Sequence, residues 1–562
     1  MSATTGPDNL TGVTPDTGLK VAQSDKAGPM LAADGTPLKT SLNRALRRQK
    51  RRALMLIAPL LIFILVTFIY PIGEMLFRSV ENQIVGDTLP RTVRVLADWN
   101  PDEADLPGPP VYSALAKDMM VASEEKNHTR LGSRLNYELS GISSLFRKSG
   151  RDVDEIGEGY AEQFVALDPA WEQPQTFIDM FAGPRWLEAN AAYDGEGARP
   201  TFRLASGSDD VLPLTAAMYR DFARVVQVED DDNPAEEEPW NSVYLSLYED
   251  LSNGAEIPAD FPHADMLTAA QAAVADFAAE DVQAAFVAMD KDWNDREVWR
   301  TLQTYSAPYT AGYFLNAADL QLTPDGIAPR PENERVYVTL FIRTLIMSTA
   351  ITLSCILLGY PIGWLLANLP SRQANLLMIL VLLPFWTSLL VRTSAWKVLL
   401  QDQGVINDLL VWIGVVSDGN RLALINNATG TIIAMTHILL PFMILPLYSV
   451  MKTIPPSYLR AAKSLGATNW TAFWRVYFPQ SVPGIGAGSI LVFILAIGYY
   501  ITPEIVGGTK GVFISNRIAY HISTSLNWGL AAALGAILLV IVLAFYWAYD
   551  RIVGIDNVKL GG

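Results

Sequence analysis

Six long apolar stretches recur along this chain of 562 residues, and each is long enough to cross a membrane. A bilayer core is about 30 Å thick, so a spanning helix needs roughly 20 apolar residues. The stretches run at about 53–77, 336–368, 376–400, 431–450, 484–503 and 530–549. Inside a bilayer every backbone polar group must be satisfied within the protein, and a helix does this by itself. The sequence therefore predicts an all-α membrane protein with six transmembrane helices.

Charged residues are distributed unevenly between the long segment that joins the first two apolar stretches and the rest of the chain. Residues 79–335 carry 47 acidic and 19 basic side chains, a net charge of −28, whereas the remaining residues carry 11 acidic and 23 basic ones, a net of +12. Basic residues concentrate on the cytoplasmic side of membrane spans. Because arginines and lysines precede the first span and follow the last one, we expect both termini in the cytoplasm and residues 79–335 outside it.

These patterns define the expected domains. We expect a disordered, basic-ended cytoplasmic tail at 1–52, a first transmembrane helix at 53–78, an acidic extracytoplasmic domain at 79–335, a five-helix core at 336–551 and a cytoplasmic C-terminus at 552–562. Helical spacing of apolar residues, as in Met266–Met289, predicts that the acidic domain is mostly helical. The one cysteine, Cys355, cannot form an intramolecular disulfide, so this domain must be held together by its core.

A polar segment at 451–483, between the fourth and fifth spans, carries the first functional motif. Ala461, Ala462 and Gly466 form a short pattern in which two helix-forming alanines precede a glycine that allows a sharp turn. It resembles the coupling loop of the permeases of ABC importers. The alternative is an ordinary amphipathic connector. The resemblance implies contact with a separate ATPase through Leu459, Arg460, Ala461, Ala462, Lys463, Leu465, Gly466 and Ala467.

Further segments extend the likeness over about 215 residues, from Val336 to Arg551. They are Leu358-Gly359-Tyr360-Pro361, Leu383-Pro384-Phe385-Trp386-Thr387, Leu439-Leu440-Pro441-Phe442-Met443 and Pro483-Gly484-Ile485. Together they resemble the spermidine/putrescine permeases of polyamine importers. The resemblance implies the type I ABC importer fold, a bacterial inner (plasma) membrane, a second permease subunit, two ATPase subunits and a periplasmic substrate-binding protein. No nucleic-acid partner is expected.

Two features depart from the family pattern. Arg460 stands where the family has Glu, so the polar contact of that residue with the ATPase is in question. The second departure is the 257-residue acidic insertion between the first two spans, where the relatives have a short loop. Its position outside the membrane fits either docking or gating by the binding protein, or a structural cap, and the sequence leaves both open.

The chain carries no pattern for catalysis of its own. A phosphate-binding loop needs a Gly-Lys dipeptide, which the chain lacks, so ATP and Mg are expected to be used by the partner ATPase. The four histidines are far apart and have no Cys companions, which argues against a metal site. We therefore expect a transporter subunit that is not an enzyme and has no cofactor or metal of its own.

Polar and aromatic residues among the apolar spans indicate a substrate path. Glu504 follows Tyr499 and Tyr500 at the outer end of the fifth span, and a carboxylate flanked by aromatic faces suits an amine. The alternative is an interfacial tyrosine belt with a solvated Glu. Three residues that follow Pro384 are expected to line the same path, namely Phe385, Trp386 and Thr387. Arg392 and Lys397 are interpreted as interfacial anchors that would otherwise repel a dication.

The resulting hypothesis is an ATP-driven, binding-protein-dependent importer of polyamines that works by alternating access. A betaine-like quaternary ammonium or sulfonium compound, or another small amine, is the alternative substrate. A membrane-anchored sensor is the remote alternative from another class, which would need a cytoplasmic output module.

Overall fold

The computed structural model describes residues 38–553, and the side chains of residues 49–551, so the expected ends at 1–37 and 554–562 lie outside the described residues. The chain divides into two compact units, Met1–Met75 and Leu76–Gly562. The first unit contains α2 (Leu38–Ile64), a π-helical turn at Leu65–Ile69 and most of α3 (Tyr70–Arg78). Gln49–Arg78 is long and apolar enough to span a membrane.

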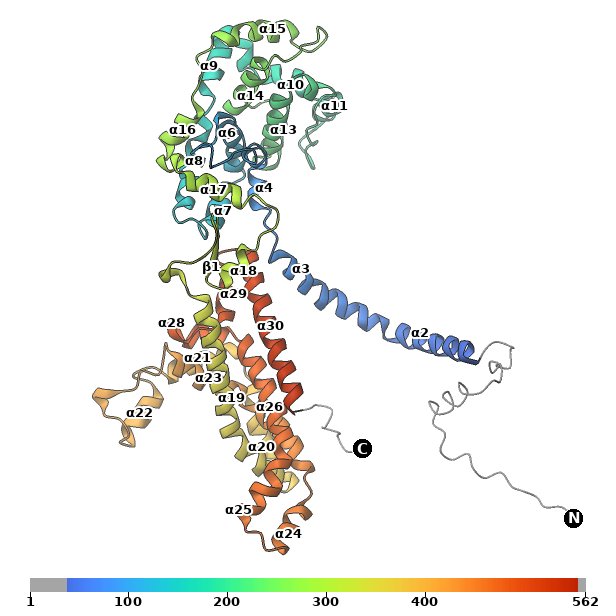
Figure 1. Cartoon of the computed structure of the whole chain (residues 1–562), viewed down its shortest axis with the longest axis vertical. Helices are drawn as coiled ribbons and strands as arrows, with labels where there is room; N and C mark the ends of the chain where they lie inside the picture. The colour runs from blue at the N-terminus through green and yellow to red at the C-terminus, as the bar shows by residue number, and fades with distance from the viewer. Residues whose placement is uncertain (1–37, 554–562) are drawn as a thin grey trace, which may run out of the picture. The chain divides into compact units, whose positions relative to one another are not determined.

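Helix α2 corrects one expected boundary. Residues 38–52 were expected within a disordered tail, but α2 begins at Leu38 and continues through them (Figure 1). The reason is composition, because Leu, Ala, Arg, Lys and Gln dominate this stretch and all are good helix formers. The basic run before the first span is therefore a helical extension of that span.

The acidic insertion is a helical domain with its own hydrophobic core (Figure 1). Proline occupies the first turn of several of its helices, where its missing N–H costs nothing. Fully buried aromatic side chains, among them Trp171, Trp293 and Trp299, fill the core. Its helices are α4 (Ile84–Thr88), α5 (Pro90–Leu96), α6 (Pro109–Glu124), α7 (Asn127–Leu135), α8 (Ile142–Asp152), α9 (Glu158–Leu167), α10 (Pro174–Phe181), α11 (Pro184–Ala191), α12 (Ser208–Val211), α13 (Pro213–Val228), α14 (Asn241–Ser252), α15 (Ala264–Ala273), α16 (Val282–Met289), α17 (Arg296–Thr304) and α18 (Gly312–Ala317).

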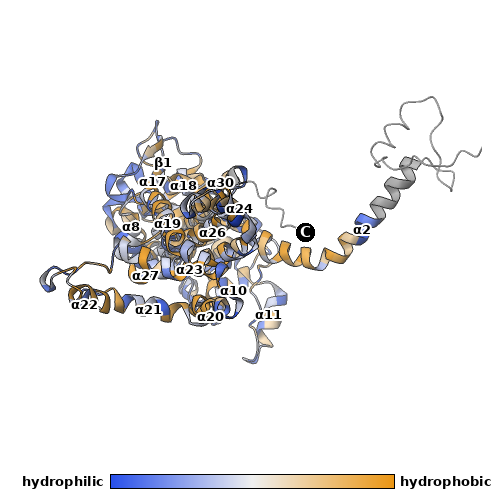
Figure 2. Cartoon of the chain, turned by 90° about the horizontal axis from the view of Figure 1, so that it is seen from below, coloured by the Kyte–Doolittle hydropathy of each residue, from blue (hydrophilic) through white to orange (hydrophobic). Residues whose placement is uncertain are grey.

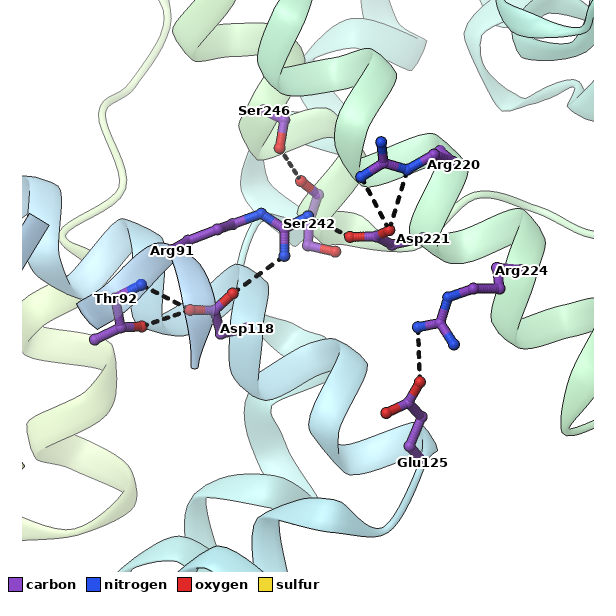
Figure 3. A network of polar contacts seen from close by, with 9 residues as sticks. All are labelled: Arg91, Thr92, Asp118, Glu125, Arg220, Asp221, Arg224, Ser242 and Ser246. Atoms are coloured by element: carbon purple, nitrogen blue, oxygen red, sulfur yellow. Dashed lines mark hydrogen bonds and ion pairs between the residues drawn. The ribbon is translucent and has the colours of Figure 1, made fainter. Parts of the chain in front are cut away.

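A buried polar network ties α5, α6 and α13 of the insertion together (Figure 3). Asp118 accepts hydrogen bonds from the backbone N and the Oγ1 of Thr92, at 2.7 and 2.8 Å, and from Arg91 at 3.1 Å. Arg91 also pairs with Asp221 on α13. Burial raises the pKa of Asp118, although the hydrogen bonds from Thr92 and the charge of Arg91 oppose this. Because every partner is buried or half-buried, the network fixes how these helices pack.

A short hairpin leads from the insertion into the membrane core. Strands β1 (Leu320–Thr323) and β2 (Gly326–Pro329) pair antiparallel around a Pro-Asp-Gly turn. Before it, Asp319 accepts hydrogen bonds from the backbone N–H groups of residues 336, 337 and 338 at 2.9–3.1 Å. These are the first N–H groups of α19 (Tyr337–Asn368), which have no partner within the helix. The insertion therefore caps the first span of the core.

The membrane core is built around three helices. Helices α19, α23 (Ala428–Thr453) and α26 (Phe478–Gly498) pack together around a buried cluster that includes Ile351, Met443 and Val492. The other elements are α20 (Ser371–Leu382), α21 (Leu389–Leu399), α22 (Val405–Trp412), α24 (Pro456–Ser464), α25 (Asn469–Ala472), α27 (Ile501–Val506), α28 (Gly508–Gly511), α29 (Ile514–Ser523) and α30 (Trp528–Val553). Figure 2 shows hydrophobic residues dominating α20 and α22.

The span count confirms the predicted membrane architecture with one change. Five helices in the described part of the chain are long and apolar enough to cross a membrane, and there are six spans if one bent pair of helices is counted as one. The span expected at 376–400 is not one continuous helix, because Ser371–Trp386 and Leu389–Leu399 meet at 94°. Pro384 lies in a 3-10 turn at Leu383–Trp386 directly before the bend, where it cannot donate a backbone hydrogen bond.

Candidate substrate path and coupling segment

The bend in the third span exposes the aromatic residues that the sequence assigned to a path. Trp386 is 69% exposed, and Phe385 is exposed while its ring lies 4.9 Å from that of Phe442 on α23. The Oγ1 of Thr387 donates a hydrogen bond to the carbonyl of Pro384 at 3.0 Å. The backbone N of Thr387 donates to the same carbonyl at 3.4 Å, so this carbonyl is satisfied where the helix is interrupted. The three predicted residues thus form the outer side of a broken helix.

Glu504 lies on α27, which begins just after α26 ends at Gly498. Its Oε2 accepts a hydrogen bond from the Nδ2 of Asn516 on α29 at 2.6 Å. The same Nδ2 donates to the carbonyl of Tyr500 at 2.9 Å, and the Oγ of Ser515 donates to the carbonyl of Tyr499 at 2.7 Å. Helix α29 therefore holds the whole Tyr499–Glu504 turn, while the carboxylate itself stays exposed.

The two predicted groups of path residues are connected through the helix that follows the bend. Helix α21, which follows the bend, contacts α27, which carries Glu504. The buried hydroxyls of Thr393 and Thr502 join these helices at 3.2 Å. Within the described residues, no hydrogen bond or ring contact links Phe385 or Trp386 directly to Tyr499 or Glu504. The structure therefore brings α21 and α27 together but does not bring the two groups of path residues into contact.

A polar cluster in the same region was missed by the sequence reading. The Nε1 of Trp396 donates to the Nδ1 of His437 at 3.1 Å. Arg392 is half-buried, its Nε has no partner in the described part of the chain, and its charge acts on His437 and Tyr499. Arg392 was interpreted as an interfacial anchor, but its side chain is half-buried and lies near His437 and Tyr499. A cation among apolar spans is itself a signal of function, and this signal was available in the sequence.

The coupling segment is an exposed helix followed by a tight turn. None of the residues of α24 is buried, and only Leu459 and Ala462 among its predicted contact residues are half-buried. Leu459 packs with the core next to Phe473, which holds the helix in place. At the end of α24, Gly466 has a φ of +90°, in the left-handed region that favours glycine. Leu465, directly before it, is 89% exposed.

The outer face of this segment has no ion-pair partner in the part of the chain that the structure describes. Arg460 and Lys463 are exposed and form no ion pair among the described residues. Three exposed apolar side chains, Tyr458, Trp470 and Trp474, lie close in sequence to Leu465. Contiguous apolar side chains rimmed by charges are typical of surfaces that bind another protein.

The comparisons with known proteins cover this same part of the chain. Residues 359–553 match the family described as binding-protein-dependent transport system inner membrane component. The spermidine/putrescine transport system permease protein PotB of Escherichia coli (strain K12) is 36% identical over 220 residues, which are 39% of this chain and 79% of that protein. PotB of Salmonella typhimurium (strain SL1344) is also 36% identical, over 39% of this chain and 76% of its own length.

Two more distant similarities complete the comparison. The inner membrane ABC transporter permease protein YdcU of Escherichia coli (strain K12) is 34% identical over 38% of this chain and 71% of its own length. Among solved structures, a chain of a bacterial alginate ABC transporter in complex with a pentasaccharide-bound periplasmic protein is 19% identical. It covers 41% of this chain and 81% of that one, with a TM-score of 0.34.

Proposed function

The chain belongs to the binding-protein-dependent ABC transporter permeases, and on this premise we propose that it forms half of the translocation path of a polyamine importer. A second permease subunit would supply the other half. Two copies of a cytoplasmic ATPase would use ATP and Mg, and a periplasmic binding protein would deliver the substrate. The orientation that follows places α24 in the cytoplasm and the acidic insertion on the opposite side of the membrane.

The observation that carries the polyamine proposal is the carboxylate of Glu504. Between Val336 and Arg551 the chain has only five acidic residues. Three of them, Asp402, Asp408 and Asp418, lie in the connection between α21 and α23, and Asp550 lies near the end of α30. Glu504 is thus the one acidic residue beside the path. It forms no ion pair among the described residues, so its charge is available to an ammonium group of a substrate.

The family relatives support the same substrate class. Two of the permeases described above are named for spermidine and putrescine. Both substrates present ammonium groups on a flexible chain, which suits a carboxylate that closely follows Tyr499 and Tyr500 in the chain. The half-buried charge of Arg392 would disfavour a dication in its immediate surroundings. We therefore place the ammonium contact on the Glu504 side of this region.

The mechanism we propose is alternating access. Closure of the ATPase pair on ATP would move α24, which is exposed and connected to α23 and α26 through short segments. Movement of these helices would rock the bundle of α19, α23 and α26 as one packed body. The bend after Trp386 and the turn before Glu504 interrupt helices at the path, and such interruptions are tolerated where they line a cavity.

The test is ATPase activity of the complete complex reconstituted with its cognate binding protein. Putrescine, spermidine and glycine betaine would be compared at equal concentrations. We expect putrescine or spermidine to stimulate hydrolysis several-fold over the binding protein alone. Stimulation by glycine betaine only would overturn the polyamine proposal and leave the permease assignment intact. Trp386, Tyr499 and Tyr500 would then be tested as an aromatic cage for the quaternary ammonium group. Absence of a co-purifying ATPase would overturn the transporter proposal itself.

A further inference from the structure

A pocket of about 670 Å³ lies between the insertion and the segment that connects α29 to α30. One wall comes from residues 81–88 and from α7 of the insertion, and the opposite wall is Thr524–Gly529. This volume is in the usual range for small-molecule sites, about 300–1,000 Å³. None of the residues of the proposed substrate path lines this pocket. It is a separate feature of the molecule, at the junction between its extracytoplasmic domain and its spans.

Arg134 supplies one hydrogen-bond donor that the protein leaves unused. Its side chain is buried, at 7% exposure, yet it lines the pocket. The Nε donates to the hydroxyl of Tyr313 at 2.9 Å and the Nη1 donates to Glu138 at 2.7 Å. The guanidinium also stacks over the ring of Tyr313 at 4.4 Å. Its Nη2 has no partner among the described residues, although buried polar groups are nearly always paired.

Asn527 supplies a second unused donor from the opposite wall. Its Oδ1 accepts a hydrogen bond from the backbone N of Leu530 at 3.2 Å and so caps α30. Its Nδ2 is buried and lacks a partner in the part of the chain that the structure describes. The preceding Leu526 has a φ of +52°, so the turn is held in a backbone conformation that a leucine rarely adopts. Two residues from two elements, each with one orphaned donor, thus line one pocket.

The charges around the pocket narrow the choice of ligand. Three arginines and two carboxylates line it, and Glu138 pairs with one of these arginines, so the positive and negative charges balance, which favours a zwitterion over a phosphate dianion. Arg130 contacts only the side-chain oxygen of Asn127, at 3.3 Å. The carboxylates of Glu81 and Asp87 form no ion pair among residues 49–551. The pocket therefore offers free positive and free negative groups at the same time.

We propose that this junction pocket binds a small amino-carboxylate, whose carboxylate is received by Arg134 and Asn527 and whose ammonium is received by Glu81 or Asp87. A molecule with both groups satisfies the two orphaned donors and neutralises the free carboxylates. It also bridges α7 of the insertion to the turn that caps α30. The site differs in chemistry from the polyamine path, because its buried unpaired groups are donors, which a polyammonium ion cannot satisfy.

Three four-carbon compounds test the proposal with the full chain in lipid nanodiscs, by isothermal titration. 4-Aminobutyrate carries both groups, butyrate carries the carboxylate alone, and putrescine carries ammonium groups alone. We expect 4-aminobutyrate to bind at least tenfold more tightly than butyrate, and putrescine not to displace it. Inorganic phosphate serves as the dianion probe and is expected not to compete.

Variants locate the binding. Replacing Arg134 would also break its buried pair with Glu138, so Asn527→Asp is the first variant. It keeps the oxygen that caps α30 and exchanges the orphaned donor for an acceptor. We expect it and Arg130→Gln to weaken binding of 4-aminobutyrate about tenfold or more. Arg151→Gln, at the end of α8 and outside the pocket lining, is the matched control and should bind like the native chain.

The outcomes separate a ligand site from a hydrated pocket. Failure of 4-aminobutyrate to bind would assign the orphaned donors to water and overturn the proposal. Unchanged binding in Asn527→Asp would place the ligand elsewhere and overturn it as well. Thermal unfolding of each variant, recorded in parallel, shows that a loss of binding comes from a folded protein. The polyamine-stimulated ATPase of the complex is a separate measurement, so the two proposals stand or fall independently.

Discussion

At the scale of single residues, Glu504 could be predicted from the sequence, but the residues that contact it could not. The residue was found because a carboxylate near membrane spans is rare and costly. Its surroundings were not found, because Asn516 lies in another helix and Thr393 pairs with Thr502 across 109 positions of the chain. Such contacts exist only after the helices have packed. The identity of a functional side chain can thus be read from the sequence, but the groups that orient it cannot.

Replacing the carboxylate of Glu504 by an amide tests how much its negative charge contributes to substrate binding. Glu504→Gln keeps an oxygen that can accept the hydrogen bond from Asn516 but removes the negative charge. A hydrogen bond to a charged group is worth about 1.5–3 kcal/mol, so we expect the polyamine concentration for half-maximal ATPase stimulation to rise roughly tenfold or more. Asp402→Asn, in the connection after α21, should leave it unchanged. Equal effects of both variants would contradict a specific contact at Glu504.

Asp290 predicts a pH dependence of stability within the insertion. Its carboxylate accepts a hydrogen bond from Lys148 at 2.7 Å and another from the backbone N of Asp292 at 3.1 Å. Burial alone would raise the pKa of Asp290, but these bonds and the charge of Lys148 outweigh burial and lower the pKa. A lowered pKa stabilises the fold above the ordinary Asp pKa of about 3.9, and this stability is lost as pH falls through the lowered value.

Asn caps a helix as well as Asp does, so the substitution Asp290→Asn removes mainly the ion pair with Lys148. We therefore expect Asp290→Asn to destabilise the full chain by up to about 1 kcal/mol at pH 7, with the difference shrinking as the pH falls below 4. Thermal unfolding in detergent at several pH values measures it. Asp292→Asn, in the same turn, is the control, because its carboxylate makes no hydrogen bond among the described residues. A gap between native chain and Asp290→Asn that stays constant with pH would refute the linkage.

At the scale of elements, the spans were predictable and the break in the third span was not. Length and hydropathy decide whether a segment crosses a membrane, and both are written in the sequence. A proline such as Pro384 does not by itself predict a 94° bend, because other prolines of the core lie inside helices that continue past them, namely Pro361, Pro441 and Pro446. Helices α19 and α23 pack against each other and against α26, which holds them straight. The difference is one of packing, which a local pattern does not contain.

The hairpin and the capping of α19 were missed for the same reason. The Pro-Asp-Gly turn at Pro324–Gly326 is a recognisable turn signal, but the strands beside it have only four residues each. Two such strands pair only where the rest of the protein already brings them together. The acidic insertion was predicted to be mostly helical from its apolar spacing, and this prediction is confirmed.

The coupling helix gives a prediction about one exposed side chain. Leu465 is 89% exposed, so Leu465→Ser should leave the melting temperature of the chain unchanged. If the ATPase covers this residue, the substitution removes a buried leucine from the interface, which is worth about 1.5–3 kcal/mol. We expect the affinity for the ATPase to fall tenfold or more, measured by titration of the purified subunits.

The control for this surface is an exposed leucine elsewhere. Leu167→Ser, at the end of α9 in the insertion, removes a comparable side chain that lies 48% exposed. It should not alter binding of the ATPase. If Leu465→Ser binds as tightly as the native chain, α24 is not the coupling element, and the exposed Trp470 and Trp474 would be the next residues to test.

At the scale of the second unit, the insertion and the membrane core meet through packed residues rather than through a flexible linker. Tyr313 of α18 packs on Gly529 of α30, and Tyr313 belongs to a buried cluster with Tyr337 and Leu530. The ring of Tyr137, in the insertion, lies 6.0 Å from that of His521 on α29. Together with the cap that Asp319 provides, these contacts connect the insertion to three elements of the core. Such a packed connection fits docking or gating by the binding protein and also fits a structural cap, so both remain predictions.

Gly529 is where this connection can be tested. A Cβ at this position would lie 2.4 Å from ring carbons of Tyr313, and the ring cannot swing away because Arg134 stacks on it and donates to its hydroxyl. Overpacking of this kind costs about 1–3 kcal/mol, so we expect Gly529→Ala to speed hydrogen exchange in α18 and the first turn of α30. The core of the insertion around Trp293 should keep its protection. Adding Tyr313→Ala removes the clashing ring and should restore protection of the first turn of α30. Faster exchange throughout both the insertion and the core, without such rescue, would mean that Gly529 matters to the whole fold rather than to the junction.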